Sequence, residues 1–538
     1  MSTADRRLLA REALLSTAIA ASLAAFLLWA RPPGIDWAAH AYQRTFLLQH
    51  GFQFWNNFWY AGRYSFITYS LIYYPLAALL GIKVLALASV ASAATAFSIV
   101  VFRQWGAVSK LSSRSFAVLW VGIIGSAAFP FMLAVSFALL SIWALQQHRR
   151  GRFALGAILT LAASPLAFLL LVIALGGAAV SRRTLRDVRG PVAVVVACAA
   201  VEVLLYRMFG DGGRFPFKTL QLLPGIAFSL LGLWVTRGVP AAKPLRGIFG
   251  LYLVVLLAAY VVPSSVGSNI ERIRYLAVPL ALIALALRKW RPLWLVVPAL
   301  ALACIWNATP IVASLVRTSN DPEASVAYWQ PAIGYLHEHL SPSFRVEVVD
   351  TAEHWPAAYF PDAGIPIVRG WYRQSDFPQN ELLYDGKIAA ATYEQWLRQM
   401  GVRYVVLSDA PPDYSSQAEA VLIRSGRTSL VPVSRTAHLT VYELPHASPL
   451  IVGPAPASVM WLWPSRLVAQ FDVPGTYRVK VRWTPYWRAS QGCVSRTQDG
   501  LVRLTVPHAG LTELSFGVSV QRGLQALAGV TPQERCAG

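Results

Sequence analysis

Two long runs without any charged residue constrain this chain more than any other feature of its sequence. They extend from Ser115 to Gln147 and from Phe153 to Ser181, and each exceeds the roughly 20 apolar residues that one membrane-spanning helix requires. Each run contains a helix breaker near its middle, Pro130 in the first and Ser164-Pro165 in the second. The mean hydropathy of +0.47 shows that the chain as a whole is apolar on average. The sequence therefore predicts a polytopic α-helical membrane protein.

Basic residues stand in six clusters between the apolar runs. If each long run forms a hairpin of two short helices, all six clusters lie on one side of the membrane, as the positive-inside rule requires. If each run forms one tilted helix, the cluster at Arg149–Arg152 faces outside. We favour the hairpins, which give about 11 transmembrane helices, a cytoplasmic N-terminus and extracytoplasmic C-terminal domains. The six clusters are Arg6–Arg11, Arg103–Arg114, Arg149–Arg152, Arg182–Arg189, Arg237–Arg246 and Arg288–Arg291.

The net charge of +21 arises almost entirely in the membrane part of the chain. Met1–Asn320 has 29 Lys and Arg against 7 Asp and Glu, whereas Asp321–Gly538 has 18 against 19. Such a distribution sets membrane topology, so we exclude nucleic-acid binding and expect a protein of the plasma membrane, with the lipid bilayer as its surroundings.

Composition and periodicity change after the last apolar run. The segments "AIGYLHEHL" and "TYEQWLRQM" have helical patterns and alternate with the strand-like "RVEVVD" and "VRYVVLSD", which predicts a small α/β domain. Further on, "YRVKVRW", "LVRLTV" and "LTELSF" alternate with a period of two, which predicts a β-sandwich. The expected domains are a transmembrane domain at 1–318 with a first outer loop at 31–65, an extracytoplasmic α/β domain at 319–444 and an extracytoplasmic β-sandwich at 445–538.

The first outer loop holds the best-placed acid of the membrane part. Asp36 follows the turn signal "RPPG", and His40 stands four residues later on the same predicted helical face. A carboxylate here can act as a general base on a substrate outside the membrane. The other interpretation is that Asp36 caps a short helix, and that His40 is an ordinary interfacial histidine.

Aromatic and amide side chains fill the rest of this loop. Most of the aromatics suit an aromatic belt at the bilayer surface, but their density beside Asn57 and Arg63 also suits stacking against a sugar or a prenyl chain. The predicted substrate-binding residues here are Trp55, Asn56, Trp59, Tyr60 and Arg63.

The segment "SSVGSNIERIRYL" is a second candidate, with Asn269, Arg272 and Arg274. Arginines on the outer side oppose the positive-inside bias, and a guanidinium binds phosphate oxygens through two parallel hydrogen bonds. They can equally anchor the next helix at the headgroups. Glu202, inside an apolar run, is a possible intramembrane polar site, although pairing with an arginine explains it as well.

Three aromatics of "WTPYWRASQG" allow two interpretations. Trp483, Tyr486 and Trp487 can offer faces to a glycan, but a sandwich core also needs large apolar residues, and we favour the core. Cys493 and Cys536 can form a disulfide in an extracytoplasmic domain, or remain as two separate thiols.

An early acid and a nearby His in the first outer loop, then "W-N-x-x-W-Y-x-G" and a Tyr-rich return helix, resemble the GT-C superfamily of membrane glycosyltransferases. Within it, the loop looks like bacterial integral membrane proteins described as pyruvoyl-tetrahydropterin-synthase-related. The resemblance covers the first ~100 residues best. It implies sugar transfer from a polyprenyl-phosphate donor to a cell-envelope glycan or lipid acceptor at the outer face, with Asp36 as the base or acceptor-orienting group.

Many members of the superfamily have two adjacent acids in this loop, whereas Trp37 follows Asp36 here. No metal ligands are therefore assigned, although a divalent metal is possible, and no other cofactor is expected. Two alternatives remain: a transporter or flippase of lipid-linked saccharides, which does not need Asp36 as a base, and a non-catalytic assembly protein whose outer domains bind polysaccharide.

Overall fold

The computed structural model describes residues 2–30, 34–180, 189–210, 213–317 and 322–529 of the chain. The chain forms two compact units. The helical unit comprises Met1–Trp37, Tyr69–Val203 and Arg214–Asn320, and the C-terminal unit comprises Ala38–Thr68, Leu204–Gly213 and Asp321–Gly538. Most of the first outer loop thus groups with the C-terminal residues, whereas the sequence predicts it as part of the transmembrane domain.

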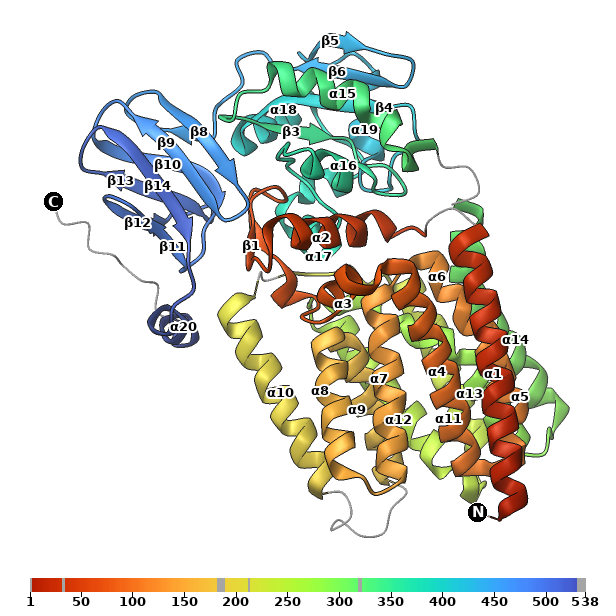
Figure 1. Ribbon diagram of the computed structural model, residues 1–538. Coiled ribbons are helices and arrows are strands. Elements are labelled where there is room, and N and C mark those ends of the chain that lie inside the picture. Colours follow the sequence, from red (N-terminus) through yellow and green to blue (C-terminus); the bar gives the residue numbers. More distant parts are fainter. Residues whose placement is uncertain (1, 31–33, 181–188, 211–212, 318–321, 530–538) are drawn as a thin grey trace. The chain divides into compact units, whose positions relative to one another are not determined.

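The helical unit consists of long apolar helices that run beside one another (Figure 1). The α-helices are α1 (Thr3–Ala30), α3 (Tyr73–Leu80), α4 (Ile82–Trp105), α5 (Lys110–Leu119), α6 (Ile123–Ser126), α7 (Phe129–Gln146), α8 (Arg150–Ala163), α9 (Pro165–Val180), α10 (Arg189–Phe209), α11 (Thr219–Thr236), α12 (Lys243–Val261), α13 (Ala277–Leu287) and α14 (Leu293–Arg317). The 3-10 helices are η2 (Gly106–Ser109), η3 (Trp120–Gly122), η5 (Pro240–Ala242) and η6 (Gly267–Leu276).

Both long uncharged runs break at the expected positions, the first between α6 and α7 and the second between α8 and α9. Pro130 lies in the first turn of α7, where its missing N–H costs no helical hydrogen bond. Ser164 takes an extended conformation between α8 and α9, as expected for a residue that precedes proline. The basic segment Arg149–Arg152 therefore lies between the two broken runs, at the start of α8.

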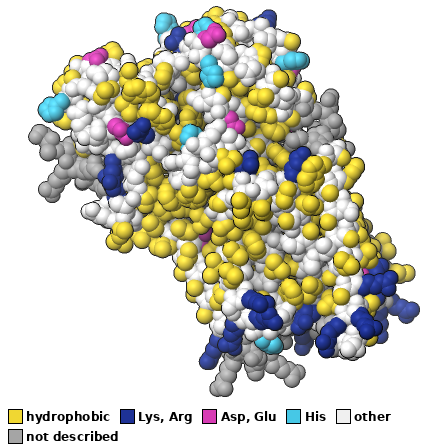
Figure 2. Space-filling view, viewed as in Figure 1, with side chains coloured by type: hydrophobic (Ala, Val, Ile, Leu, Met, Phe, Trp, Pro, Cys, Tyr) yellow, Lys and Arg dark blue, Asp and Glu magenta, His cyan; other side chains and the backbone are white. Residues whose placement is uncertain are grey.

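Seven helical stretches of the described chain are long and apolar enough to cross a membrane by length and composition. The prediction of about 11 spans also counts shorter helices such as α8, α9 and α13. In α10 only 11% of the apolar window is buried, against 61% in α7. Apolar side chains cover much of the visible surface of the helical unit, and Lys and Arg gather at the end that holds the N-terminus (Figure 2). The chain is a multi-pass membrane protein, and its orientation stays a prediction.

An α/β domain forms the first half of the C-terminal unit. Its four-stranded sheet has the order β3-β4-β6-β5, in which β3 pairs with β4 in parallel and the other neighbours are antiparallel. Its elements are η7 (Pro322–Ala324), α15 (Val326–His339), β3 (Arg345–Val348), α16 (Pro356–Asp362), α17 (Arg373–Gln379), η8 (Glu381–Tyr384), α18 (Ala390–Met400), β4 (Val402–Ser408), α19 (Gln417–Arg424), β5 (Val431–Arg435) and β6 (Leu439–Glu443).

A β-sandwich follows, with two antiparallel sheets in the orders β12-β13-β10-β7 and β11-β14-β9-β8. Residues that alternate along β9, β10 and β13 point into one shared apolar core. Tyr486 and Trp487 are buried in this core, as we favoured, whereas Trp483 is only half-buried at its edge. Its elements are β7 (Ile451–Val452), β8 (Ala457–Trp463), β9 (Arg466–Phe471), β10 (Gly475–Arg482), β11 (Trp487–Ala489), β12 (Cys493–Arg496), β13 (Leu501–Val506), β14 (Gly510–Phe516) and α20 (Val520–Leu527).

The first outer loop adds α2 (Trp37–His50), the short hairpin of β1 (Trp55–Asn56) and β2 (Arg63–Tyr64), and η1 (Phe66–Thr68). The N–H of Asn57 donates to the carbonyl of Pro464 at 2.8 Å, and that of Ile367 to the carbonyl of Phe58 at 3.0 Å. The loop thereby hydrogen-bonds to both the β-sandwich and the α/β domain.

Candidate functional site

The turn between α6 and α7 receives the beginning of the first outer loop. The N–H of Ile35 donates to the carbonyl of Gly125 at 3.2 Å, and that of Asp36 to the carbonyl of Ser126 at 3.4 Å. Ala127, the next residue of the turn, has a left-handed φ of 52°, which is uncommon for a residue with a Cβ atom. These contacts fix the backbone of Asp36, whose side chain is half-buried.

The close approach of these two backbones depends on Gly34. A Cβ atom at this position would lie 2.5 Å from the carbonyl oxygen of Ile124, which is closer than any side chain allows. One residue after Asp36, the ring of Trp37 meets that of Phe129 edge-to-face at 5.1 Å. The "RPPG" signal therefore ends in a glycine that lets Asp36 reach the α6–α7 turn.

The second predicted segment, η6, reaches the same turn from another part of the chain. The hydroxyl of Tyr275 donates to Oγ of Ser126 at 3.2 Å. The guanidinium carbon of Arg272 lies 5.3 Å from the centroid of the Phe131 ring. The two candidate segments of the helical unit therefore meet at one turn, although more than 200 residues separate them in the sequence.

Arg274 has an unusual environment. Its carbonyl accepts a hydrogen bond from Nδ2 of Asn307 at 2.7 Å, but its buried Nε has no hydrogen-bond partner among the described residues. A buried donor of this kind normally has a partner, and an anionic ligand can supply one. Burial raises the pKa of the neighbouring Glu271 to about 7, against a smaller opposing effect of Arg274. Asn269 is half-buried in the same segment.

His40 and Glu202 lie in other surroundings. His40 is fully buried in α2 within the C-terminal unit, where its ring lies 5.5 Å from that of Trp371. Its role beside Asp36 stays a prediction. Glu202 is half-buried in α10, the most exposed of the candidate spans.

The aromatic motif of the first outer loop packs inside the C-terminal unit. Trp55 is 2% exposed, and its ring stacks on that of Phe516 with 5.5 Å between the ring centroids. Its Nε1 donates to Oδ1 of Asn57 at 2.7 Å. Trp59 is fully buried, and its Nε1 donates to the carbonyl of Ala357 at 2.9 Å. These contacts would have to open before either ring could stack on a sugar.

The remaining residues of the motif make structural contacts as well. Nδ2 of Asn56 donates to the Tyr42 hydroxyl at 2.9 Å, and the hydroxyl of Tyr60 donates to the carbonyl of Tyr372 at 3.1 Å. Tyr60 has a positive φ. The guanidinium carbon of Arg63 lies 3.5 Å from the centroid of the Tyr372 ring.

Steric crowding explains why the motif ends in a glycine. Gly62 has a φ of 110°, and a Cβ atom there would lie 2.5 Å from the ring of Trp55. The "W-N-x-x-W-Y-x-G" pattern thus fastens the first outer loop to the domains that follow the membrane helices.

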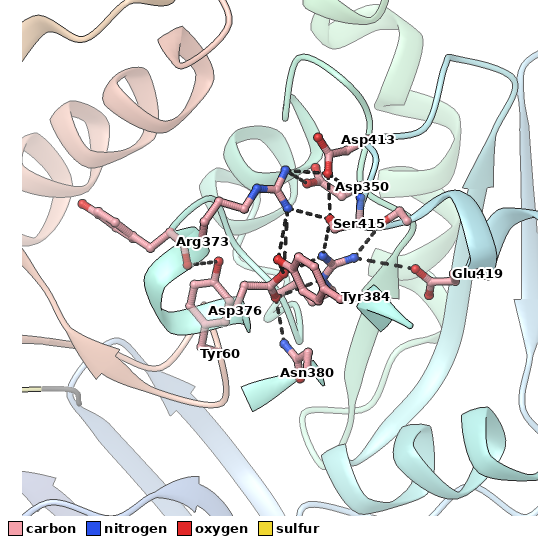
Figure 3. Close-up of polar contacts among 12 residues, drawn as sticks. Tyr60, Asp350, Arg373, Asp376, Asn380, Tyr384, Asp413, Ser415 and Glu419 are labelled. Carbon is pink, nitrogen blue, oxygen red and sulfur yellow. Dashed lines mark hydrogen bonds and ion pairs between the residues drawn. The ribbon is translucent and has the colours of Figure 1, made fainter. Parts of the chain in front are cut away.

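A buried network of charges that no sequence motif predicts lies in the α/β domain (Figure 3). Arg369 holds Asp376 through two hydrogen bonds, Nε to Oδ1 at 3.0 Å and Nη2 to Oδ2 at 2.6 Å. It also donates to the hydroxyls of Ser415 and Ser416 at 2.7 and 2.5 Å. Nη1 of Arg369 also lies 3.7 Å from Oε2 of Glu419.

A second arginine completes the network. Nη2 of Arg373 lies 2.6 Å from Oδ2 of Asp413 and 3.7 Å from Oδ2 of Asp350. Its Nη1 donates to Oγ of Ser415 at 2.6 Å. Asp350 in turn pairs with Nδ1 of His354 at 2.8 Å. Asp350 and Asp413 follow the parallel strands β3 and β4, so the network forms where both strands end, a common position for ligand sites in α/β folds.

Burial and charge perturb the acids of this network in opposite directions. Burial alone would raise the pKa of Asp413, but Arg373 and His354 lower it to about 2. Burial raises the pKa of Glu419 to about 7 and that of Glu347 well above its usual range. For Glu347, burial is the main cause of the raised pKa, and the nearby charge of Glu419 adds to it.

Within the described ranges, no group of three or more His, Cys, Asp or Glu residues is arranged to hold a metal ion. Cys493 is disulfide-bonded, and Cys536, the partner that we considered, lies outside the described residues.

No protein-family model and no curated protein matches the chain. It is similar to a mutant of the arabinofuranosyltransferase AftD from Mycobacteria, with a TM-score of 0.46 and 17% identity over 83% of this chain and 42% of that one. It is also similar to ArnT from Cupriavidus metallidurans in the apo state, with a TM-score of 0.39 and 14% identity over 80% of this chain and 97% of that one. The same ArnT bound to undecaprenyl phosphate gives a TM-score of 0.33 at 13% identity, over 85% of this chain and 100% of that one.

The chain thus spans about two fifths of the AftD chain that it matches. At these TM-scores the likenesses define neither the family nor the activity of the chain. The pterin-synthase-related family, which the first outer loop resembles, is not confirmed.

Proposed function

We propose that the chain is a membrane glycosyltransferase that moves a sugar from a polyprenyl-phosphate donor to a cell-envelope glycan or lipid acceptor. Asp36 is the general base, and Arg272 and Arg274 bind the donor phosphate. The observation that carries this proposal is the meeting of the Asp36 backbone and the η6 segment at the α6–α7 turn. These contacts support a site that combines the acid of one segment with the two cations of the other.

The chemistry requires both kinds of residue. The Asp36 carboxylate accepts the proton of an acceptor hydroxyl as the hydroxyl oxygen attacks the anomeric carbon of the donor sugar. The bond between that carbon and the phosphate oxygen breaks, and the polyprenyl phosphate leaves with an additional negative charge. The guanidinium groups of Arg272 and Arg274 stabilise this charge, and Nε of Arg274, which has no partner among the described residues, supplies one hydrogen bond. No step needs a protein-held metal.

The test uses the purified full-length protein in lipid nanodiscs with radiolabelled polyprenyl-phosphate sugars and cell-envelope acceptors. General-base assistance contributes about 10²–10⁴-fold in rate, so Asp36→Asn should reduce transfer by that factor and keep donor binding. Asp472→Asn, an exposed acid of the β-sandwich, is the matched control and should transfer normally.

Two results would contradict the proposal. Near-normal transfer by Asp36→Asn would make Asp36 a helix cap, because Asn caps a helix about as well as Asp. Absence of transfer with every donor, together with movement of the donor across liposome membranes, would identify a flippase of lipid-linked saccharides instead.

A further inference from the structure

A cavity of about 450 Å³ lies in the C-terminal unit. It is bordered by the β1–β2 hairpin, the end of α10, strands of the β-sandwich and the residues around α20. Its volume falls within the roughly 300–1,000 Å³ that is typical of small-molecule sites. The charged and aromatic residues of its lining are Arg207, Arg482, Arg496, Trp55, Tyr64 and Trp483.

The charges around the cavity favour an anion. Among the described residues, its lining contains three arginines and no Asp or Glu. Nε of Arg482 donates to the carbonyl of Tyr60 at 3.4 Å, and the positive charges of Arg207 and Arg496 border the same cavity, where they would attract a carboxylate or phosphate. The planar guanidinium fork also matches the oxygen pairs of both anions.

Aromatic and amide groups around the cavity favour a sugar as the carrier of the anion. Trp483 is half-buried, and the guanidinium carbon of Arg496 lies 5.8 Å from the centroid of its ring. Arg496 can therefore reach a substituent of a ring that packs beside the indole. Oε1 of Gln379, also in the lining, is buried without a hydrogen-bond partner among the described residues, and a sugar hydroxyl is a suitable donor for it.

We propose that this cavity binds a sugar with an anionic substituent, either a uronate or a sugar phosphate. The site goes beyond the proposed transferase function, because all its lining residues belong to the C-terminal unit, whereas Asp36 and η6 belong to the helical unit. Its ligand is held by charge and by ring contacts, so binding can be measured without turnover.

The experiment measures binding to the full-length protein in nanodiscs by titration calorimetry. The probes are methyl glucuronide, glucose 1-phosphate, the neutral methyl glucoside and inorganic phosphate. At least one anionic sugar should bind at least about tenfold more tightly than the neutral glucoside, since charge-assisted hydrogen bonds are the strong ones. The tighter of the two anionic sugars identifies the source of the charge.

Variants separate this site from general attraction to a basic protein. Arg207→Gln and Arg496→Gln should each weaken binding of the anionic sugar by about tenfold. Arg503→Gln is the matched control, because Arg503 is exposed on β13 of the same β-sandwich and does not line this cavity. Trp483→Leu should weaken binding of the anionic sugar without changing that of inorganic phosphate. Thermal unfolding of each variant confirms that it is folded.

Several results would overturn the proposal. These are equal affinity for the neutral glucoside, affinity for inorganic phosphate equal to that for the better anionic sugar, and no binding of either anionic sugar by the folded wild type. An equal loss in Arg503→Gln, or none in Arg207→Gln and Arg496→Gln, would also overturn it. Because Asp36→Asn should bind these probes normally, failure here is distinguishable from failure of the proposed transferase function.

Discussion

Replacement of Arg369 by Gln should open the α/β domain locally. Arg369 is 3% exposed and makes two hydrogen bonds to Asp376 and one to each of two serine hydroxyls. Gln removes the charge and most of these bonds, and leaves the Asp376 carboxylate buried. Breaking a buried ion pair in this way costs about 3–5 kcal/mol.

The same domain contains a matched control. Arg403 donates to Oε1 of Glu443 at 3.1 and 3.0 Å, but the two side chains are 35% and 36% exposed. Water replaces such a pair readily, so Arg403→Gln should cost at most about 1 kcal/mol. Both substitutions remove an arginine from a hydrogen-bonded carboxylate, but Arg369 is buried and also lies 3.7 Å from Glu419, whereas Arg403 is partly exposed.

Hydrogen–deuterium exchange of the full-length protein in nanodiscs measures the local cost through the amides of β3 and β4. Each 1.4 kcal/mol is a factor of ten, so these amides should exchange about 100-fold to several-thousand-fold faster in Arg369→Gln. In Arg403→Gln the increase should be at most about fivefold. Exchange in Arg369→Gln no faster than in Arg403→Gln would refute the conclusion that the buried network supports this sheet.

Three other predictions concern phosphate binding, pH and topology. Replacing both Arg272 and Arg274 by Gln should weaken donor binding by at least about tenfold in a titration, and unchanged affinity would leave them as membrane anchors. The lowered pKa of Asp413, about 2 against an ordinary 3.8, stabilises the fold fully above about pH 4, and this contribution of roughly 2 kcal/mol is lost as the pH falls through 2. Asp413→Asn should lack that acid-dependent loss in thermal unfolding between pH 5 and 2, and an unchanged pH profile would contradict it. A reporter fused after Arg152 should be cytoplasmic and one after Val316 external, and an external signal at Arg152 would reject the predicted orientation.

Local signals in the sequence predicted much of the fold. Pro130 and Ser164-Pro165 marked the two helix breaks, because proline removes a backbone donor and restricts the residue before it. The period-two patterns of "YRVKVRW" and "LVRLTV" likewise marked β10 and β13. These features depend on neighbouring residues alone, so they are visible without the tertiary structure.

The tertiary surroundings of the candidate residues were not visible in the same way. Trp59 has the same sequence signature whether its ring faces a sugar or the carbonyl of Ala357, and only long-range packing decides. No local pattern marks Arg369 and Arg373 as buried, because their partners follow other elements of the domain. One signal was available: Asp350 and Asp413 each follow a predicted strand, and parallel strands would bring them to one edge.

The position of Trp55 within the β-sandwich core sets a time scale for folding. Tyr64, in the same hairpin, bonds to a threonine 420 residues later in the chain. At about 5–20 residues per second of synthesis, the hairpin waits roughly 20–80 s for its partners. A two-stranded hairpin alone is at best marginally stable in water. The sandwich therefore completes its core only after nearly the whole chain has left the ribosome, and until then the Trp55 indole is an apolar surface that a chaperone can bind.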